Sequence, residues 1–173
     1  MPHRKKVILS ALTLSLCYVP MNAQGMGGGG GCVEANIGVT EIISPLDFAQ
    51  IGACTATAGT VTVDPNGGAL TTTGCIASTG GAPSIAQVRV VAGQSSNSTR
   101  VFIRIPAVAN IASGGDTMDL NGFALRRGGQ VDTTVTQNGR QTRTYDIGGT
   151  LNVDGGQAGG TYTGSVAVSA TCL

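Results

Sequence analysis

Apolar and polar residues alternate with a period of two along most of the chain. Between residues 33 and 40 the apolar positions are Val33, Ala35, Ile37 and Val39, and the residues between them are polar or glycine. Successive side chains of a β-strand point to opposite faces, so this pattern predicts a strand with one buried face.

The same alternation recurs along the chain, and turn signals rich in Gly, Asn and Asp separate its occurrences. The alternating segments are Val61 to Val63, Ala86 to Val90, Val101 to Ile105, and Tyr162 to Ala170, of which the last is the longest and cleanest. The turn signals are Asp64 to Gly68, Ser113 to Asp116, Asn138-Gly139 and Asp154 to Gly156. Sustained helical spacing is missing beyond the first residues, so we predict an all-β domain, either a sandwich or a barrel.

The N-terminus has a different pattern. Arg4, Lys5 and Lys6 precede an uncharged stretch from Val7 to Val19, and the small residue Ala23 follows. These are the three parts of a secretory signal peptide, and the stretch is shorter than the roughly 20 residues of a transmembrane helix. We therefore predict a signal peptide at 1–23, with its exact cleavage site open, and export to the periplasm, cell surface or medium.

Two further segments follow the predicted signal peptide. The glycine run Gly27–Gly31 gives a Gly-rich flexible leader at 24–31. The β domain is predicted at 32–173, and about 150 residues in all would remain after cleavage, enough for one domain with a core.

Cleavage changes the composition in a way that bears on function. The only His, His3, and both Lys residues lie within 1–23. Without Arg4, Lys5 and Lys6, seven of ten cationic side chains remain against nine Asp and Glu, so the formal charge falls from +1 to −2. This balance argues against a nucleic-acid partner. Without His the commonest general base is missing, so we expect a non-enzymatic protein with no cofactor.

The predicted mature chain keeps four cysteines, Cys32, Cys54, Cys75 and Cys172. Their wide spacing and the lack of His favour two disulfides over a zinc site. Three pairings are possible. We favour Cys54 with Cys75, which flank a predicted hairpin, and Cys32 with Cys172, which would join the two ends of the domain.

Other candidate sites have simpler explanations. The carboxylates Asp64, Asp116, Asp132, Asp146 and Asp154 lie in or beside predicted turns, where Asp bonds to the backbone, so a catalytic pair is not favoured. Asp116, Asp119 and Asn121 miss the spacing of a calcium loop, and a turn explains them better. The basic pair Arg126-Arg127 fits a solvated turn or an anion site. The mature aromatics are few, and several are needed for the core.

Several segments together resemble a known family. They are Pro45-Leu46-Asp47-Phe48, Gly59 to Val63, Thr99 to Pro106, Ile147 to Val153, and Gly160 to Val168. Over residues 37–171 the chain resembles domain-of-unknown-function family 4402, a bacterial family of secreted β domains. That family is distantly similar to spore-coat-U-like and chaperone–usher pilin domains, which implies an immunoglobulin-like antiparallel β-sandwich. Ala49 stands where the family usually has Gly, and the cysteines are not part of its general pattern.

The resemblance gives the strand at 33–40 two interpretations. This strand could be donated to complete the sheet of a neighbouring subunit, as in donor-strand fibres, or it could form this domain's own first strand, which we favour. Its apolar residues are Val33, Ala35, Ile37 and Val39. A Cys32–Cys172 bridge would hinder donation.

Two hypotheses for function follow. We expect an exported structural or surface protein, of fimbrial or coat-like type, that pairs β-strands with itself or another surface subunit. The alternative is a monomeric periplasmic or extracellular module that binds a sugar or another small ligand.

Overall fold

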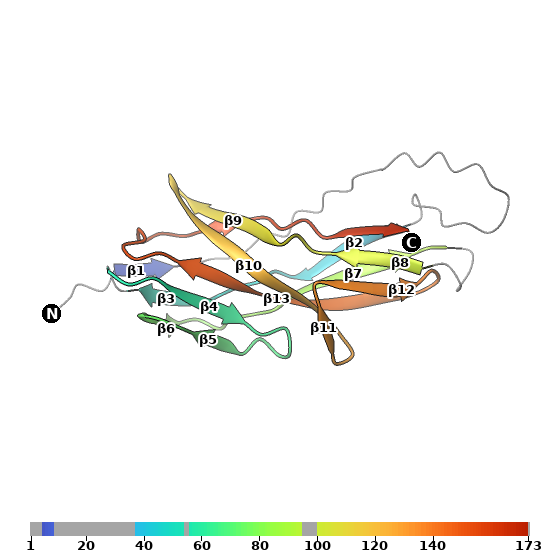
Figure 1. Cartoon of the computed structure of the whole chain (residues 1–173), viewed down its shortest axis with the longest axis horizontal. Coiled ribbons are helices and arrows are strands. Elements are labelled where there is room, and N and C mark those ends of the chain that lie inside the picture. Colours follow the sequence, from blue (N-terminus) through green and yellow to red (C-terminus); the bar gives the residue numbers. More distant parts are fainter. Residues whose placement is uncertain (1–4, 9–36, 54–55, 95–99, 173) are drawn as a thin grey trace.

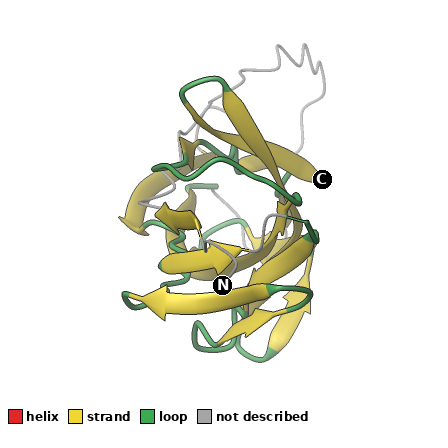
Figure 2. Ribbon diagram, turned by 90° about the vertical axis from the view of Figure 1, so that its left-hand side faces the viewer, coloured by secondary structure: helices red, strands yellow, loops and turns green. Residues whose placement is uncertain are grey.

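The computed structural model describes residues 5–8, 37–53, 56–94 and 100–172. Within these ranges every regular element is a β-strand, and all strand pairs are antiparallel. The described part contains no helix that is long and apolar enough to span a membrane. The predicted all-β fold is confirmed (Figures 1 and 2).

The largest sheet contains nine strands. Its main path runs β14-β9-β10-β13-β4-β5, with β7 also paired to β13, β2 paired to β7, and β11 paired to β10. The bounds of these strands are β2 Ile37–Ser44, β4 Gly59–Val63, β5 Leu70–Thr72, β7 Ala86–Ala92, β9 Val108–Ser113, β10 Asp116–Arg127, β11 Gln130–Asp132, β13 Thr142–Val153 and β14 Thr163–Gly164.

Two smaller sheets each contain three strands, in the orders β1-β3-β6 and β12-β8-β15. Their bounds are β1 Lys5–Ile8, β3 Gln50–Ala53, β6 Ile76–Gly80, β8 Arg100–Arg104, β12 Thr134–Asn138 and β15 Ser169–Cys172. Figure 1 shows the first sheet at one end of the molecule and the second near the other end.

The strand order agrees with an immunoglobulin-like sandwich. In such domains the first, second, fifth and fourth strands pair in the order A-B-E-D, and C pairs with F in the second sheet. Here β2, β7, β13 and β10 pair in that order. In addition, β8 pairs with β15 as C does with F. Of the remaining strands, β3 to β6 lie between A and B, β9 between C and D, β11 and β12 between D and E, and β14 between E and F, while β1 precedes A.

The core lies between these layers and is built from the predicted alternation. In β7, for example, Ala86, Val88 and Val90 are fully buried while Arg89 is exposed. In the β8 segment Val101, Ile103 and Ile105 are likewise buried. The hairpin of β4 and β5 closes through Asp64 to Gly68, as the turn signal predicts.

The two longest strands were not predicted in full from the alternation. β10 and β13 each contain 12 residues. A bulge between Asn121 and Ala124 interrupts the alternation of β10. In β13 the pair Gly148-Gly149 resembles a turn signal, but both glycines lie buried inside the strand.

β13 joins three other strands. Along one edge, its first half pairs with β7 and its second half with β4. Its other edge pairs with β10. Gly148 allows β4 to approach closely, because a Cβ at this position would overlap the carbonyl oxygen of Val63 and the Pro65 ring.

The predicted continuous strand from Tyr162 to Ala170 is wrong. β14 and β15 are separated by residues 165–168, which belong to no strand. The predicted faces are nevertheless correct there, since Val166 and Val168 are buried and Ser165 and Ala167 are exposed. Alternation alone indicates which side chains are buried. It does not indicate whether the backbone pairs with a neighbouring strand.

Ala49 lies at the sharp bend between β2 and β3. Its φ of 58° is the only positive value among the non-glycine residues that the structure describes. The Ala49 N–H donates to Oδ1 of Asp47 across 2.7 Å. This left-handed conformation suits Gly best, which gives a physical reason for a Gly at this position.

Candidate functional site

The residues predicted for strand donation lie partly in the described structure. Ile37 and Val39 belong to β2 and pair with Ala92 and Val90 of β7 in the same chain. Ile37 is only 4% exposed. Val33 and Ala35 lie outside the described residues. Ile37 and Val39 thus form part of this domain's own first strand.

The cysteine pairing stays a prediction. Cys75 and Cys172 are each disulfide-bonded. Cys75 precedes β6, and Cys172 is the last residue of β15. The partners predicted for them, Cys54 and Cys32, lie outside the described residues.

A strand is added to the outer edge of β3. There β1 pairs antiparallel with β3, with Lys5 opposite Ala53 and Ile8 opposite Gln50. The other edge of β3 pairs with β6. β3 alternates between intermediate and buried residues, with Ile51 and Ala53 facing the core. This edge therefore accepts a short strand from a part of the chain distant in sequence.

The carboxylates are dispersed, and the described residues contain no group of three or more metal-ligating His, Cys, Asp or Glu side chains. Asp116, Asp119 and Asn121 lie along β10; the turn before them is at Gly114 and Gly115. The expectation that these three residues form a turn is therefore wrong, and their extended backbone is not a calcium loop.

The basic pair Arg126-Arg127 ends β10 and faces protein groups. Arg126 Nη1 lies 3.4 Å from Asp146 Oδ2. Asp146 Oδ1 also accepts a hydrogen bond from Gln87 Nε2 at 2.7 Å. Arg127 Nη1 donates to the carbonyl oxygen of Thr136 at 3.4 Å. These contacts make the pair structural rather than an anion site.

A buried polar pair lies behind Arg127. The Tyr145 hydroxyl donates to Gln137 Oε1 at 2.7 Å, and Gln137 Nε2 donates to the carbonyl oxygen of Gln141 at 2.9 Å. Burial raises the pKa of the Tyr145 hydroxyl above its ordinary value of 10.0, while the nearby charges of Arg127 and Arg143 act in the opposite direction. The Tyr145 hydroxyl and the Gln137 amide thus have hydrogen-bond partners within the protein, which indicates a structural role in the core.

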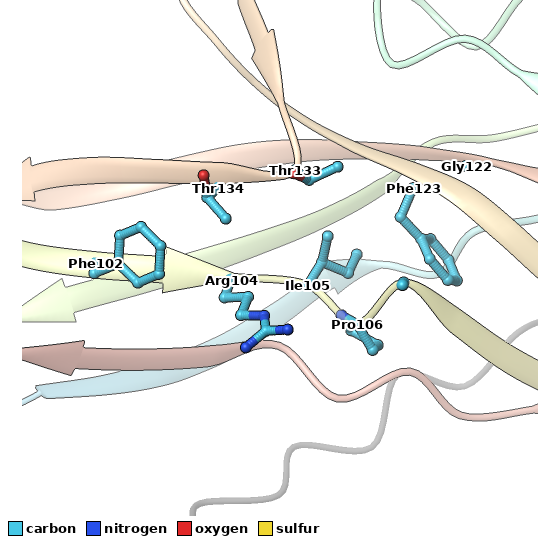
Figure 3. A pocket seen from close by; sticks show the side chains of 9 residues that line it. Phe102, Arg104, Ile105, Pro106, Gly122, Phe123, Thr133 and Thr134 are labelled. Atoms are coloured by element: carbon cyan, nitrogen blue, oxygen red, sulfur yellow. The ribbon is translucent and has the colours of Figure 1, made fainter.

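A pocket of about 430 Å³ opens where three strands are interrupted. Its walls come from the break between β8 and β9 at residues 105–107, from the β10 bulge at Gly122, and from Thr133 between β11 and β12 (Figure 3). Ile105 and Phe123, each 3% exposed, form apolar lining. Bulges often occur beside functional sites, and the volume is within the range of small-ligand pockets.

The polar and aromatic lining of the pocket comes mainly from β8 and β12. Phe102 is partly exposed and Arg104 is exposed on β8, and Thr134 begins β12 opposite Arg104. The sequence pattern does not predict this pocket. The position of Arg104 within an alternating strand indicates an outward side chain, but its neighbours depend on a pairing with β12 that the sequence pattern does not reveal.

The fold and these features define an all-β sandwich domain with a strand-accepting edge and a small pocket. A family model described as Domain of unknown function (DUF4402) matches residues 37–171, and the chain belongs to this family. The resemblance inferred from the sequence is thereby confirmed at the level of the family. No curated protein and no solved structure matches the chain.

Proposed function

We propose that the protein is an exported, non-enzymatic structural or surface subunit, of fimbrial or coat-like type, that assembles by β-strand pairing. The observation that carries the proposal is the pairing of β1 with β3. β1 lies inside residues 1–23, which have the features of a signal peptide. Removal of this segment would leave the outer edge of β3 without its partner.

An exposed strand edge is a template for another chain. The backbone N–H and C=O groups of Gln50 to Ala53 that face β1 would then be available to an incoming strand. A strand added there places the residues opposite Ile51 and Ala53 on the core-facing side, so it needs alternate apolar residues. The partner would be a strand of another copy or of another surface subunit.

The donor segment is narrower than the sequence pattern predicts. Ile37 and Val39 are already used in pairing with β7. Val33 and Ala35 continue the alternation before β2 and remain candidates for donation. This version of the proposal leaves β2 in place and uses only the residues that precede it.

The first experiment examines assembly. The natively exported protein, with its signal peptide removed, would be examined by size-exclusion chromatography and negative-stain microscopy. We expect oligomers or fibres. A strictly monomeric protein that is unchanged by added peptide 32–40 would overturn the proposal.

The second experiment locates the edge. Isotope-labelled mature protein is titrated with peptide 32–40, and a scrambled peptide of the same composition is the control. We expect amide resonances of Gln50 to Ala53 to shift, and those of β5, the edge strand Leu70–Thr72, to stay in place. Shifts at β5 and not at β3 would show that a different edge accepts the strand.

A further inference from the structure

The outer face of the β12-β8-β15 sheet brings an aromatic ring, a cation and several hydroxyl groups together. Phe102 of β8 lies between Thr136 of β12 and Thr171 of β15. Arg104, two residues further along β8, lies between Thr134 and Ser169. Residues directly opposite in antiparallel strands share a face, so these six side chains lie on one surface.

Phe102 differs from the other aromatic residues in the described structure. Phe48, Phe123, Tyr145 and Tyr162 are all at most 3% exposed. Phe102 alone is partly exposed, at the centre of its sheet and at the edge of the pocket. The core accounts for the other four rings. An accessible ring beside hydroxyl groups is suited to stacking against the apolar face of a sugar.

Arg104 supplies the charge. Its side chain is exposed, and the ion pairs of the described residues involve Arg89 and Arg126 instead. Figure 3 shows Phe102 and Arg104 along β8, with the Arg104 guanidinium extending from the strand on the side of Pro106. A guanidinium binds a carboxylate through two parallel hydrogen bonds, which favours a planar anionic group on the ligand.

The pocket gives this surface depth. It is lined by Phe102 and Arg104 from this surface, by the buried side chains of Ile105 and Phe123, and by Thr133 and Thr134. A ligand that satisfies all these groups has a ring with an apolar face, hydroxyl groups at its rim and one carboxylate. A uronic acid has each of these features.

We propose that Phe102, Arg104 and the neighbouring threonines form a binding site for an acidic sugar residue of a polysaccharide. The sugar ring stacks on Phe102, its hydroxyl groups bond to Thr134 and its neighbours, and its carboxylate pairs with Arg104. The site lies on a different sheet from β3. It is therefore independent of the proposed strand pairing and can operate in a monomer or in an assembly.

The test is a titration of isotope-labelled mature protein with an oligomer of glucuronic acid. The matched ligands are a glucose oligomer of the same length, which lacks the carboxylate, and acetate, which lacks the ring. We expect amide shifts at Phe102, Arg104 and Thr134 with the acidic oligomer, roughly tenfold weaker binding of the neutral one, since a charged hydrogen bond contributes about that factor, and no shifts with acetate.

Variants separate the two recognition elements. Arg104→Gln is expected to weaken binding of the acidic oligomer about tenfold and leave the neutral one unchanged. Phe102→Leu, which keeps an apolar side chain, should lose binding of both the acidic and the neutral oligomer. Phe102→Tyr should keep binding of both oligomers. Arg140→Gln, at an exposed arginine in the β12–β13 turn, is the matched control. No shifts with the acidic oligomer at millimolar concentration, or equal effects of Arg104→Gln and Arg140→Gln, would overturn the proposal.

Discussion

Tyr145 provides the hydrogen bond that satisfies the buried side-chain oxygen of Gln137, across 2.7 Å. Gln137 is 1% exposed and Tyr145 is fully buried. A buried amide without partners is costly, so the two residues are compatible with the core only as a pair.

Replacing Tyr145 by Phe should therefore destabilise the domain although the ring is kept. The change leaves Gln137 Oε1 buried without a donor, which costs about 1–3 kcal/mol in the free energy of unfolding. Chemical denaturation of the two proteins measures this. In the double variant with Gln137→Leu, part of the loss should be recovered; equal stability of Tyr145→Phe and wild type would contradict the role given to the hydroxyl.

The raised pKa of Tyr145 predicts how stability changes in alkaline solution. The unfolded chain loses the tyrosine proton near pH 10, whereas the folded protein retains it to higher pH because the hydroxyl is buried. The folded state then binds more protons, so stability should be unaffected below pH 10 and fall as the pH rises through the folded pKa. Denaturation between pH 8 and pH 11 checks the sign. Tyr145→Phe should show a smaller decrease over this range than wild type.

Gly148 should not tolerate a side chain. An added Cβ would overlap the Val63 carbonyl oxygen and the Pro65 ring, which are backbone or ring atoms with little freedom to move. We expect Gly148→Ala to cost roughly 3 kcal/mol through overpacking. At Gly115 an added Cβ meets no heavy atom within 4 Å, so Gly115→Ala is the matched control. Comparable melting temperatures of the two variants would show that β4 can shift away from β13.

Asp47 fixes the bend that carries Ala49. Asp47→Ala removes the acceptor of the Ala49 N–H and should cost about 1 kcal/mol. Asp47→Asn keeps a side-chain oxygen at the same position and should retain most of the stability. The prediction is wrong if both variants unfold at the same denaturant concentration.

The disulfide pairing can be tested without mutation. Proteolysis of the non-reduced mature protein followed by mass spectrometry should yield linked peptides containing Cys54 with Cys75 and Cys32 with Cys172. Loss of one such bridge typically costs about 2–4 kcal/mol, so reduction should lower the melting temperature. A free or intermolecular Cys32 would instead remove the main obstacle to strand donation by the residues that follow it.

The parts of the fold that follow from local pattern could be predicted from the sequence. The alternation in β4, β7 and β8 identifies buried residues such as Val88 and Ile103, and the Gly-rich turns identify where hairpins close. The length and continuity of the strands are harder to predict from the sequence, because a buried pair such as Gly148-Gly149 has the same composition as a turn. Only the partner strand determines that those glycines lie within β13.

The candidate sites depend still more on pairing between distant segments. Arg104 and Thr134 are 30 positions apart in the chain and become neighbours only through the β8–β12 register. The strand-accepting edge of β3 likewise depends on the bend at Ala49, which lies between β2 of the large sheet and β3 of the smaller one. Neither relationship is encoded in a local motif, so periodicity and composition could not predict either of them.

The position of β13 bears on how the domain loses its structure. Its two edges hold β7, β4 and β10, which themselves carry most of the remaining strands of the large sheet. If one of these three strands separates, the other two still hold β13 in the sheet. β13 can therefore leave the sheet only when its contacts to all three strands break. Local opening should therefore be confined to strands far from β13, and separation of β13 amounts to global unfolding in a single cooperative step.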